Sequence, residues 1–202
     1  ELSSDYITEG HALKGVLKAD MENIRSTMEK IDYNTFEDVV NNIFAAKRIY
    51  IIGLRSSMAL AEFLGFYLNI ILQNVKTVGY GISDIFEQMI NVGEGDLVIG
   101  IGFPRYASRT IDALAFAQDR GATVVAVTDS FLSPLAARAD YSLIAQSNMA
   151  SFVDSLVAPL SVINALIIAV GMREKENISS TFNSLEEIWR EYNVYSYNNR
   201  NV

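Results

Sequence analysis

Residues 48–72 read RIYIIGLRSSMALAEFLGFYLNIIL, and this stretch decides the fold. Residues 49–52 form a short apolar run rich in β-branched side chains, which predicts a buried strand. Gly53 ends the run, and the long apolar segment after Ser56 and Ser57 predicts a helix. Because a helix N-terminus carries unpaired N–H groups and a partial positive charge, the connecting loop favours an anion. Ordinary helix capping by Ser56 or Ser57 explains the same residues.

The rest of the chain repeats this alternation of strand and helix. Further apolar runs predict strands at residues 75–80, 97–103, 122–127 and 141–145. Helices are predicted at residues 85–91, 109–120, 134–138 and, in a long uncharged segment, 155–172. Nearly continuous apolar strands that alternate with helices predict an α/β fold, a three-layer α-β-α sandwich around a five-stranded parallel sheet. Ligands of such sheets bind outside the carboxyl ends of the strands, so the loops to inspect are 53–57, 80–84, 103–108 and 128–133.

Helices are also predicted at both ends of the chain. Residues 13–28 carry apolar side chains at helical spacing, and Thr35 is expected to cap a second helix over residues 36–44. Ser184, with Glu187 three residues later, is expected to open a last amphipathic helix. We therefore divide the chain into a linker helix within residues 1–34, a central domain over 35–178, and a C-terminal helix and tail over 179–202.

Composition excludes several classes of protein. Half of the 202 residues are hydrophobic, the formal net charge is −8, and there is no cysteine. A broad nucleic-acid surface needs a basic face, and disulfides or thiolate metal sites need cysteine, so neither is expected. No signal peptide is visible, and we expect a cytoplasmic protein without metal or cofactor. Residues 155–172 approach the length of a membrane span, but Ser155, Pro159, Ser161 and Asn164 favour a buried helix.

Three segments, in order, resemble the motifs of the sugar isomerase (SIS) domain. They are the strand-Gly-x-x-Ser-Ser-helix at residues 49–60, DLVIGIGFPRYASRT at 96–110, and ATVVAVTDSFLSPLAARADYSL at 122–143. The resemblance covers about residues 35–175. Two segments, Gly-Leu-Arg-Ser-Ser at 53–57 and Phe-Pro-Arg-Tyr at 103–106, resemble the effector domains of RpiR-type bacterial transcription regulators more than the SIS enzymes.

The resemblance implies a regulatory domain that binds a phosphorylated sugar or amino sugar. In RpiR-type regulators a helix-turn-helix domain precedes the SIS domain, so residues 1–34 are expected to be the joining helix. DNA would then be contacted only through that N-terminal domain. We also expect a homodimer or higher homo-oligomer, because the helices predicted over 58–72 and 155–172 are too apolar all round for a monomer of this size.

The same resemblance implies a set of ligand-binding residues in the loops. Ser56 and Ser57 match the first loop, whereas Pro104 in the second loop supplies neither hydroxyl nor N–H. Arg55, Arg105 or Ser108 can compensate, because a guanidinium grips phosphate with two hydrogen bonds. The remaining candidates are Asp84, Tyr106, Thr128 and Ser133. Each also has a purely structural explanation: a salt bridge for the arginines, packing for Tyr106, and capping or turn formation for the others.

Two other functions remain open. An aldose–ketose phosphate isomerase needs a base beside the moving proton. The one histidine, His11, lies outside the SIS-like segment, and Glu62 falls on the first long helix. Asp84, Glu87 and Asp154 are candidate bases, but no acid–base pair stands out. A purely structural oligomerisation module would need only the apolar helices and would bind no ligand.

Overall fold

Five parallel strands form the centre of the molecule in a computed structural model that describes residues 11–150 and 152–195. They are β1 (Ile49–Ile52), β2 (Val75–Val78), β3 (Leu97–Ile101), β4 (Thr123–Thr128) and β5 (Tyr141–Ile144), and their order is β2-β1-β3-β4-β5. In register, Ile51 pairs with Thr77 on one side and with Ile99 on the other. The chain leaves β1 toward β2 and then returns to the opposite side of β1 to form β3. This reversal opens a crevice outside the carboxyl ends of β1 and β3, where ligands of open parallel sheets bind.

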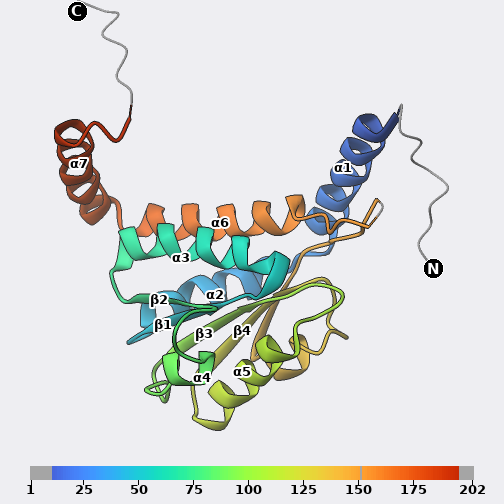
Figure 1. Cartoon of the computed structure of the whole chain (residues 1–202), viewed down its shortest axis with the longest axis horizontal. Helices are drawn as coiled ribbons and strands as arrows, with labels where there is room; N and C mark the ends of the chain where they lie inside the picture. Colours follow the sequence, from blue (N-terminus) through green and yellow to red (C-terminus); the bar gives the residue numbers. More distant parts are fainter. Residues whose placement is uncertain (1–10, 151, 196–202) are drawn as a thin grey trace, which may run out of the picture.

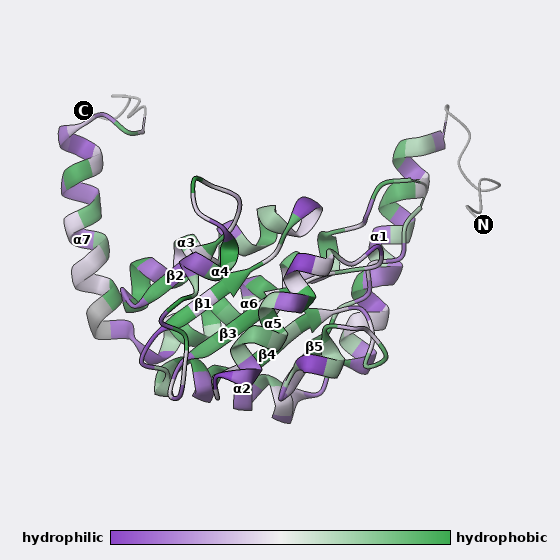
Figure 2. Ribbon diagram, turned by 60° about the horizontal axis from the view of Figure 1, so that its bottom comes forward, coloured by the Kyte–Doolittle hydropathy of each residue, from purple (hydrophilic) through white to green (hydrophobic). Residues whose placement is uncertain are grey.

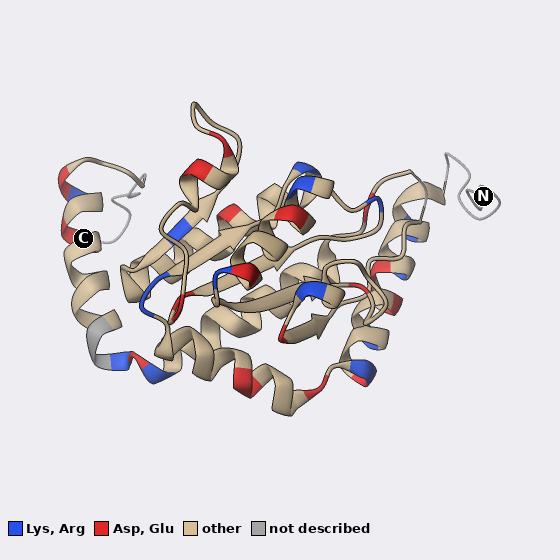
Figure 3. Cartoon of the chain, turned by 90° about the horizontal axis from the view of Figure 1, so that it is seen from below, with Lys and Arg blue, Asp and Glu red and all other residues tan. Residues whose placement is uncertain are grey.

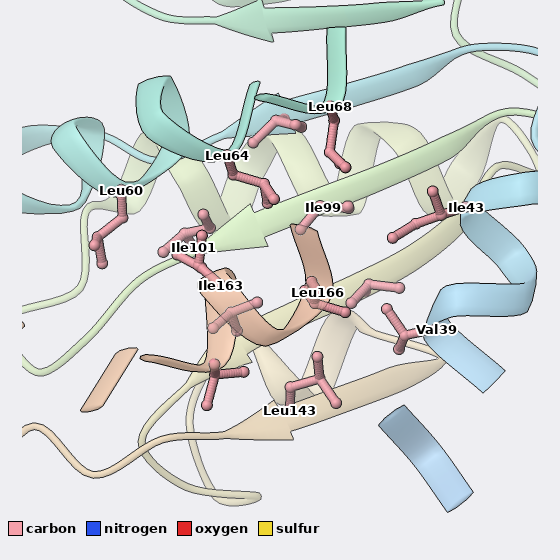
Figure 4. Close-up of a cluster of buried hydrophobic side chains, with 14 of the residues drawn as sticks. Val39, Ile43, Leu60, Leu64, Leu68, Ile99, Ile101, Leu143, Ile163 and Leu166 are labelled. Carbon is pink, nitrogen blue, oxygen red and sulfur yellow. The ribbon is translucent and has the colours of Figure 1, made fainter. Parts of the chain in front are cut away.

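Helices cover both faces of the sheet, as predicted (Figure 1). One layer holds α2 (Tyr33–Ala45), α3 (Met58–Leu72) and α6 (Val157–Arg173), and the other holds α4 (Ile85–Gln88), α5 (Ser108–Asp119) and the 3-10 turn η3 (Ala136–Arg138). Successive strand residues point to opposite faces, so Ile51 and Ile99 pack under the first layer while Ile52 and Val98 pack under the second. Figure 4 shows the first of these clusters, with Leu64 of α3 and Leu166 of α6 over β3.

The strands at the centre are apolar and buried on both faces. Every residue of β1 and β3 is buried, and the ribbon in this region has the colours of apolar residues in Figure 2. Charged residues lie mostly on the helices and loops around the sheet (Figure 3). The edge strand β2 is partly exposed. Charge that serves a function therefore has to come from the loops and the helix ends.

Two helices project from this body at opposite ends (Figure 1). α1 (Ala12–Lys30) packs against α6, and α7 (Lys175–Glu191) packs against α3 and α6. The buried residues of α1 are polar, Asn23 and Thr27, whereas its predicted apolar stripe is exposed. The stripe comprises Leu13, Val16, Leu17, Met21, Ile24 and Met28.

Several element boundaries differ from the prediction. The cap of α2 is Asp32, not Thr35, because the Asp32 carboxylate accepts the backbone N–H groups of Asn34 and Thr35 at 3.2 and 3.1 Å. Those hydrogen bonds also hold the pKa of Asp32 below its usual value, together with the larger contribution of the Thr35 hydroxyl. The last helix begins at Lys175, not Ser184, because the Ser184 hydroxyl donates to the carbonyl of Ser180 one turn back instead of capping an N-terminus.

Other predicted features are confirmed. Asp84 and Glu87 form the expected capping box, although α4 ends at Gln88 rather than near residue 91. Pro159 lies in the first turn of α6. Within the described residues no single helix has the length and apolarity to cross a membrane; α6 and residues 178–191 pass such a test only as a pair bent by 108°. The first ten residues and the tail beyond 195 lie outside the described residues.

Candidate ligand-binding site

A cavity of about 530 Å³ lies outside the carboxyl ends of β1 and β3. The topological reversal of the sheet predicts a ligand at this place. The cavity is bounded by the loop after β1, the loop after β3, the first turn of α5 and the segment before α6. Its lining residues are Leu54, Arg55, Ser56, Ser57, Tyr80, Ile101, Gly102, Phe103, Pro104, Arg105, Tyr106, Ala107, Ser108, Arg109, Thr110 and Asp154.

The loop after β1 forms the first wall. Residues Arg55–Ser57 make a 3-10 turn, η2, which runs directly into α3. Gly53 allows the tight return: a Cβ there would lie 2.7 Å from the carbonyl oxygen of Ser57. Ser57 is buried at the N-cap of α3, yet its hydroxyl makes no capping hydrogen bond. The capping explanation is therefore wrong for Ser57.

The loop after β3 and the start of α5 form the second wall. Ala107 is the N-cap of α5 and supplies no side-chain cap, so the first N–H groups of this twelve-residue helix have no capping side chain. Thr110 is only 1% exposed, and its hydroxyl has no hydrogen-bond partner among the described residues. Because an unpaired buried hydroxyl is costly, Thr110 is available to a polar group in the cavity.

Three arginines and two aspartates set the charge of the site. Arg105 donates from Nη2 to Oδ1 of Asp154 at 2.9 Å, and Arg109 forms an ion pair with Asp84. The exposed Arg55 makes no ion pair with any described residue. The residues that line the cavity include three arginines and one aspartate, and this positive excess favours an anion within a chain that is acidic overall.

Tyr106 connects the second loop to the end of β4. Its hydroxyl donates to Oδ1 of Asp129 at 2.7 Å, and the Thr128 hydroxyl donates to the same oxygen at 3.2 Å. Burial, and then the Asp129 carboxylate, raise the pKa of Tyr106 well above its ordinary value. The phenol is therefore neutral at physiological pH and adds no charge to the cavity.

Six of the nine sequence-predicted residues line the cavity, namely Arg55, Ser56, Ser57, Arg105, Tyr106 and Ser108. The other three do not line it. Asp84 caps α4 and reaches the cavity only through Arg109. Thr128 is fully buried against Asp129, and the Ser133 hydroxyl accepts the N–H of Ala136, which fits its capping explanation.

Sequence reasoning missed Tyr80, Arg109 and Thr110 as lining residues, and it considered Asp154 only as a base. Arg109 and Thr110 directly follow Ser108, so the expected helix N-terminus is a signal that could have found them. Of the candidate bases, Asp84 and Glu87 are engaged in the capping box, and both oxygens of Asp154 accept hydrogen bonds. Glu62 is exposed on α3, and His11 lies at the start of α1.

Comparison with known proteins places this geometry in context. The family model described as the SIS domain matches residues 42–169. An uncharacterized HTH-type transcriptional regulator of Haemophilus influenzae is 28% identical over 182 residues, which cover 88% of this chain and 62% of that protein. The chain thus spans less than two thirds of this relative's length.

Solved structures show the same fold. The sugar isomerase domain of the RpiR transcription factor from Sphaerobacter thermophilus superposes with a TM-score of 0.83 at 30% identity, over 88% of this chain and 99% of that one. The Vibrio vulnificus NanR protein, solved in complex with ManNAc-6P, has a TM-score of 0.75 at 19% identity, over 91% of this chain and 70% of NanR.

Proposed function

The chain belongs to the SIS domain family, and from that premise we propose that it is the effector-binding domain of an RpiR-type transcriptional regulator of carbohydrate metabolism. The observation that carries the proposal is the convergence on one cavity of two helix starts, of the Thr110 hydroxyl and of Arg55, neither of which is paired with another described residue. A cavity of about 530 Å³ is within the size range of small-molecule sites, about 300–1,000 Å³.

We propose a phosphorylated sugar or amino sugar as the effector. Its phosphate lies at the start of η2 and α3, where it accepts hydrogen bonds from the hydroxyls of Ser56 and Ser57 and forms an ion pair with Arg55. The sugar ring lies toward the start of α5, where Ser108 and Thr110 offer hydroxyls and Tyr106 offers a ring. NanR, which shares the fold, was solved with a phosphorylated amino sugar, and this supports the class of ligand.

The remaining parts of the chain fit a regulator. We propose that α1 joins this domain to an upstream helix-turn-helix domain, through which alone the protein contacts DNA in the cytoplasm. Support comes from the HTH-type relative, of which this chain spans only part. A helix that projects from one end of the domain also suits a connection between two domains.

We further propose that the domain forms a homodimer or a higher homo-oligomer. The sequence pointed to α3 and α6 as the interface, but much of their apolar surface packs against each other and the sheet. Exposed apolar side chains remain at Phe66, Ile168 and Met172, and the α1 stripe is larger still. Exposed apolar patches of this kind are typical of interaction sites.

A calorimetric titration with a panel of sugar phosphates tests the effector site. The double variant Ser56→Ala/Ser57→Ala removes two hydroxyls that face the proposed phosphate, and hydrogen bonds to charged groups contribute about 1.5–3 kcal/mol each. Affinity for the best member of the panel should fall by at least about tenfold. Ser184→Ala, an exposed serine on α7, is the matched control and should bind as the wild type does.

Unchanged affinity in the double variant would overturn the site. A turnover assay with the same panel separates the regulator from an isomerase. Interconversion of an aldose and a ketose phosphate at a rate that falls in Asp84 or Glu87 variants would establish the enzyme instead.

A further inference from the structure

The Asp154 carboxylate occupies Ser56, which the proposed phosphate would use, and Arg105, which lines the same cavity. One of its oxygens accepts the Ser56 hydroxyl at 2.8 Å, and the other accepts Nη2 of Arg105 at 2.9 Å. Asp154 comes from the segment before α6, far in sequence from both partners, and its side chain is only 16% exposed. This carboxylate accepts hydrogen bonds from a serine at a helix start and from an arginine, so it occupies the position that an anionic ligand would take.

The residue after Asp154 is tied to the projecting helix α1. The Ser155 hydroxyl donates to Oδ1 of Asp20 at 2.6 Å. Figure 1 shows the segment that leads into α6 lying beside the inner end of α1. Because Cα atoms of adjacent residues are about 3.8 Å apart, a backbone shift that carries Asp154 out of the cavity also moves Ser155.

Additional hydrogen bonds join this segment to α1. Asn23, which is 1% exposed, donates to the carbonyl of Asn148 at 2.9 Å and accepts its N–H at 3.2 Å. The Ser147 hydroxyl donates to the carbonyl of Ser155 at 2.9 Å and so closes the segment on itself. The segment before α6 thus contacts α1 through Asn148 as well as through Ser155.

We propose that Asp154 is an internal competitor of the effector's phosphate and that its displacement signals ligand binding to α1. The inference rests on the proposed function, because it specifies how that same site is regulated. Two anions cannot share Ser56 and Arg105, since like charges at such a distance repel. The Arg105 side chain is 66% exposed, and an ion pair with an exposed arginine contributes little, so a dianionic phosphate with more acceptor oxygens displaces the carboxylate. By reciprocity, whatever fixes α1 in its present position opposes ligand binding.

The test uses the 202-residue chain and titration with inorganic phosphate, followed by amide NMR and by hydrogen exchange of α1. Asp154→Asn removes the competing charge and should bind phosphate about tenfold more tightly than the wild type. Asp119→Asn, an exposed aspartate at the end of α5, makes the same charge change away from the cavity and should bind as the wild type does. Phosphate should speed exchange in α1 of the wild type, whereas α1 of Asp154→Asn should exchange fast already without phosphate.

A second variant separates competition from signalling. Ser155→Ala keeps the Asp154 carboxylate but removes the hydrogen bond to Asp20. Its phosphate affinity should stay within about threefold of the wild type, while phosphate should no longer change exchange in α1.

Weaker or equal phosphate binding by Asp154→Asn would overturn the competition. If phosphate leaves the hydrogen-exchange rates of α1 in the wild type unchanged, the proposed signalling to α1 is wrong. If neither protein binds phosphate or any member of the sugar-phosphate panel, the proposed function itself falls, and the inference falls with it.

Discussion

Gly53→Ala is expected to damage both the stability of the domain and its binding site. The added methyl group would lie 2.7 Å from the carbonyl oxygen of Ser57 and 3.2 Å from that of Ile101. The Cβ atom of Ala61 also lies at 3.2 Å, and no side-chain rotation moves any of these three atoms, so the backbone around η2 must shift. Extra methyl groups in well-packed surroundings cost about 1–3 kcal/mol, and we expect a loss of unfolding free energy in this range.

The loop that has to move carries Arg55, Ser56 and Ser57, so ligand affinity should fall together with stability. Urea denaturation followed by circular dichroism measures the first effect, and calorimetry with the best sugar phosphate of the panel measures the second. Gly93→Ala is the matched control, because a Cβ at that position would meet only the Arg120 carbonyl oxygen, at an ordinary 3.7 Å. If Gly53→Ala stays within about 0.5 kcal/mol of the wild type and binds equally well, the close approach does not hold this loop in place.

Three further changes probe separate parts of the molecule. Thr110→Val replaces a buried hydroxyl that has no partner among the described residues by a methyl group. The unfolding free energy measured in urea should therefore stay equal or rise by up to about 1 kcal/mol, while ligand affinity measured by calorimetry should fall about tenfold. A clear loss of stability would contradict this prediction. Asp96→Ala removes a buried carboxylate that accepts two hydrogen bonds from the half-exposed Arg48 and one from a backbone N–H. Urea denaturation should show a loss of unfolding free energy of about 2 kcal/mol. Ligand affinity should not change, because Asp96 lies at the opposite end of β3 from the cavity, and weaker binding would refute this. Sedimentation equilibrium at micromolar concentration should show a species heavier than the 22.4 kDa chain, and the chain mass alone would refute the homo-oligomer.

The amino-acid sequence by itself determined the layers of this fold. Residues 49–52 are apolar at every position, short and rich in β-branched side chains, which favours a strand buried on both faces, and the alternation of such runs with helices favours a parallel sheet. Gly53 and the two serines marked the loop that lines the cavity, because a glycine and a helix start are local features. The start of α7 was missed since no capping side chain marks Glu174, whereas the Ser184–Glu187 pattern inside the helix imitates a cap.

The tertiary structure alone decided which of these loop residues act together. Asp154 meets Ser56 across 98 positions of sequence, and Ser155 meets Asp20 across 135, because the path of α6 over the sheet brings its start beside both α1 and the cavity. The unpaired state of the Thr110 hydroxyl likewise depends on what surrounds it once the chain is folded. Local pattern fixes strands and helices through short-range backbone preferences, but hydrogen bonds between distant loops follow only from the packing of the whole domain.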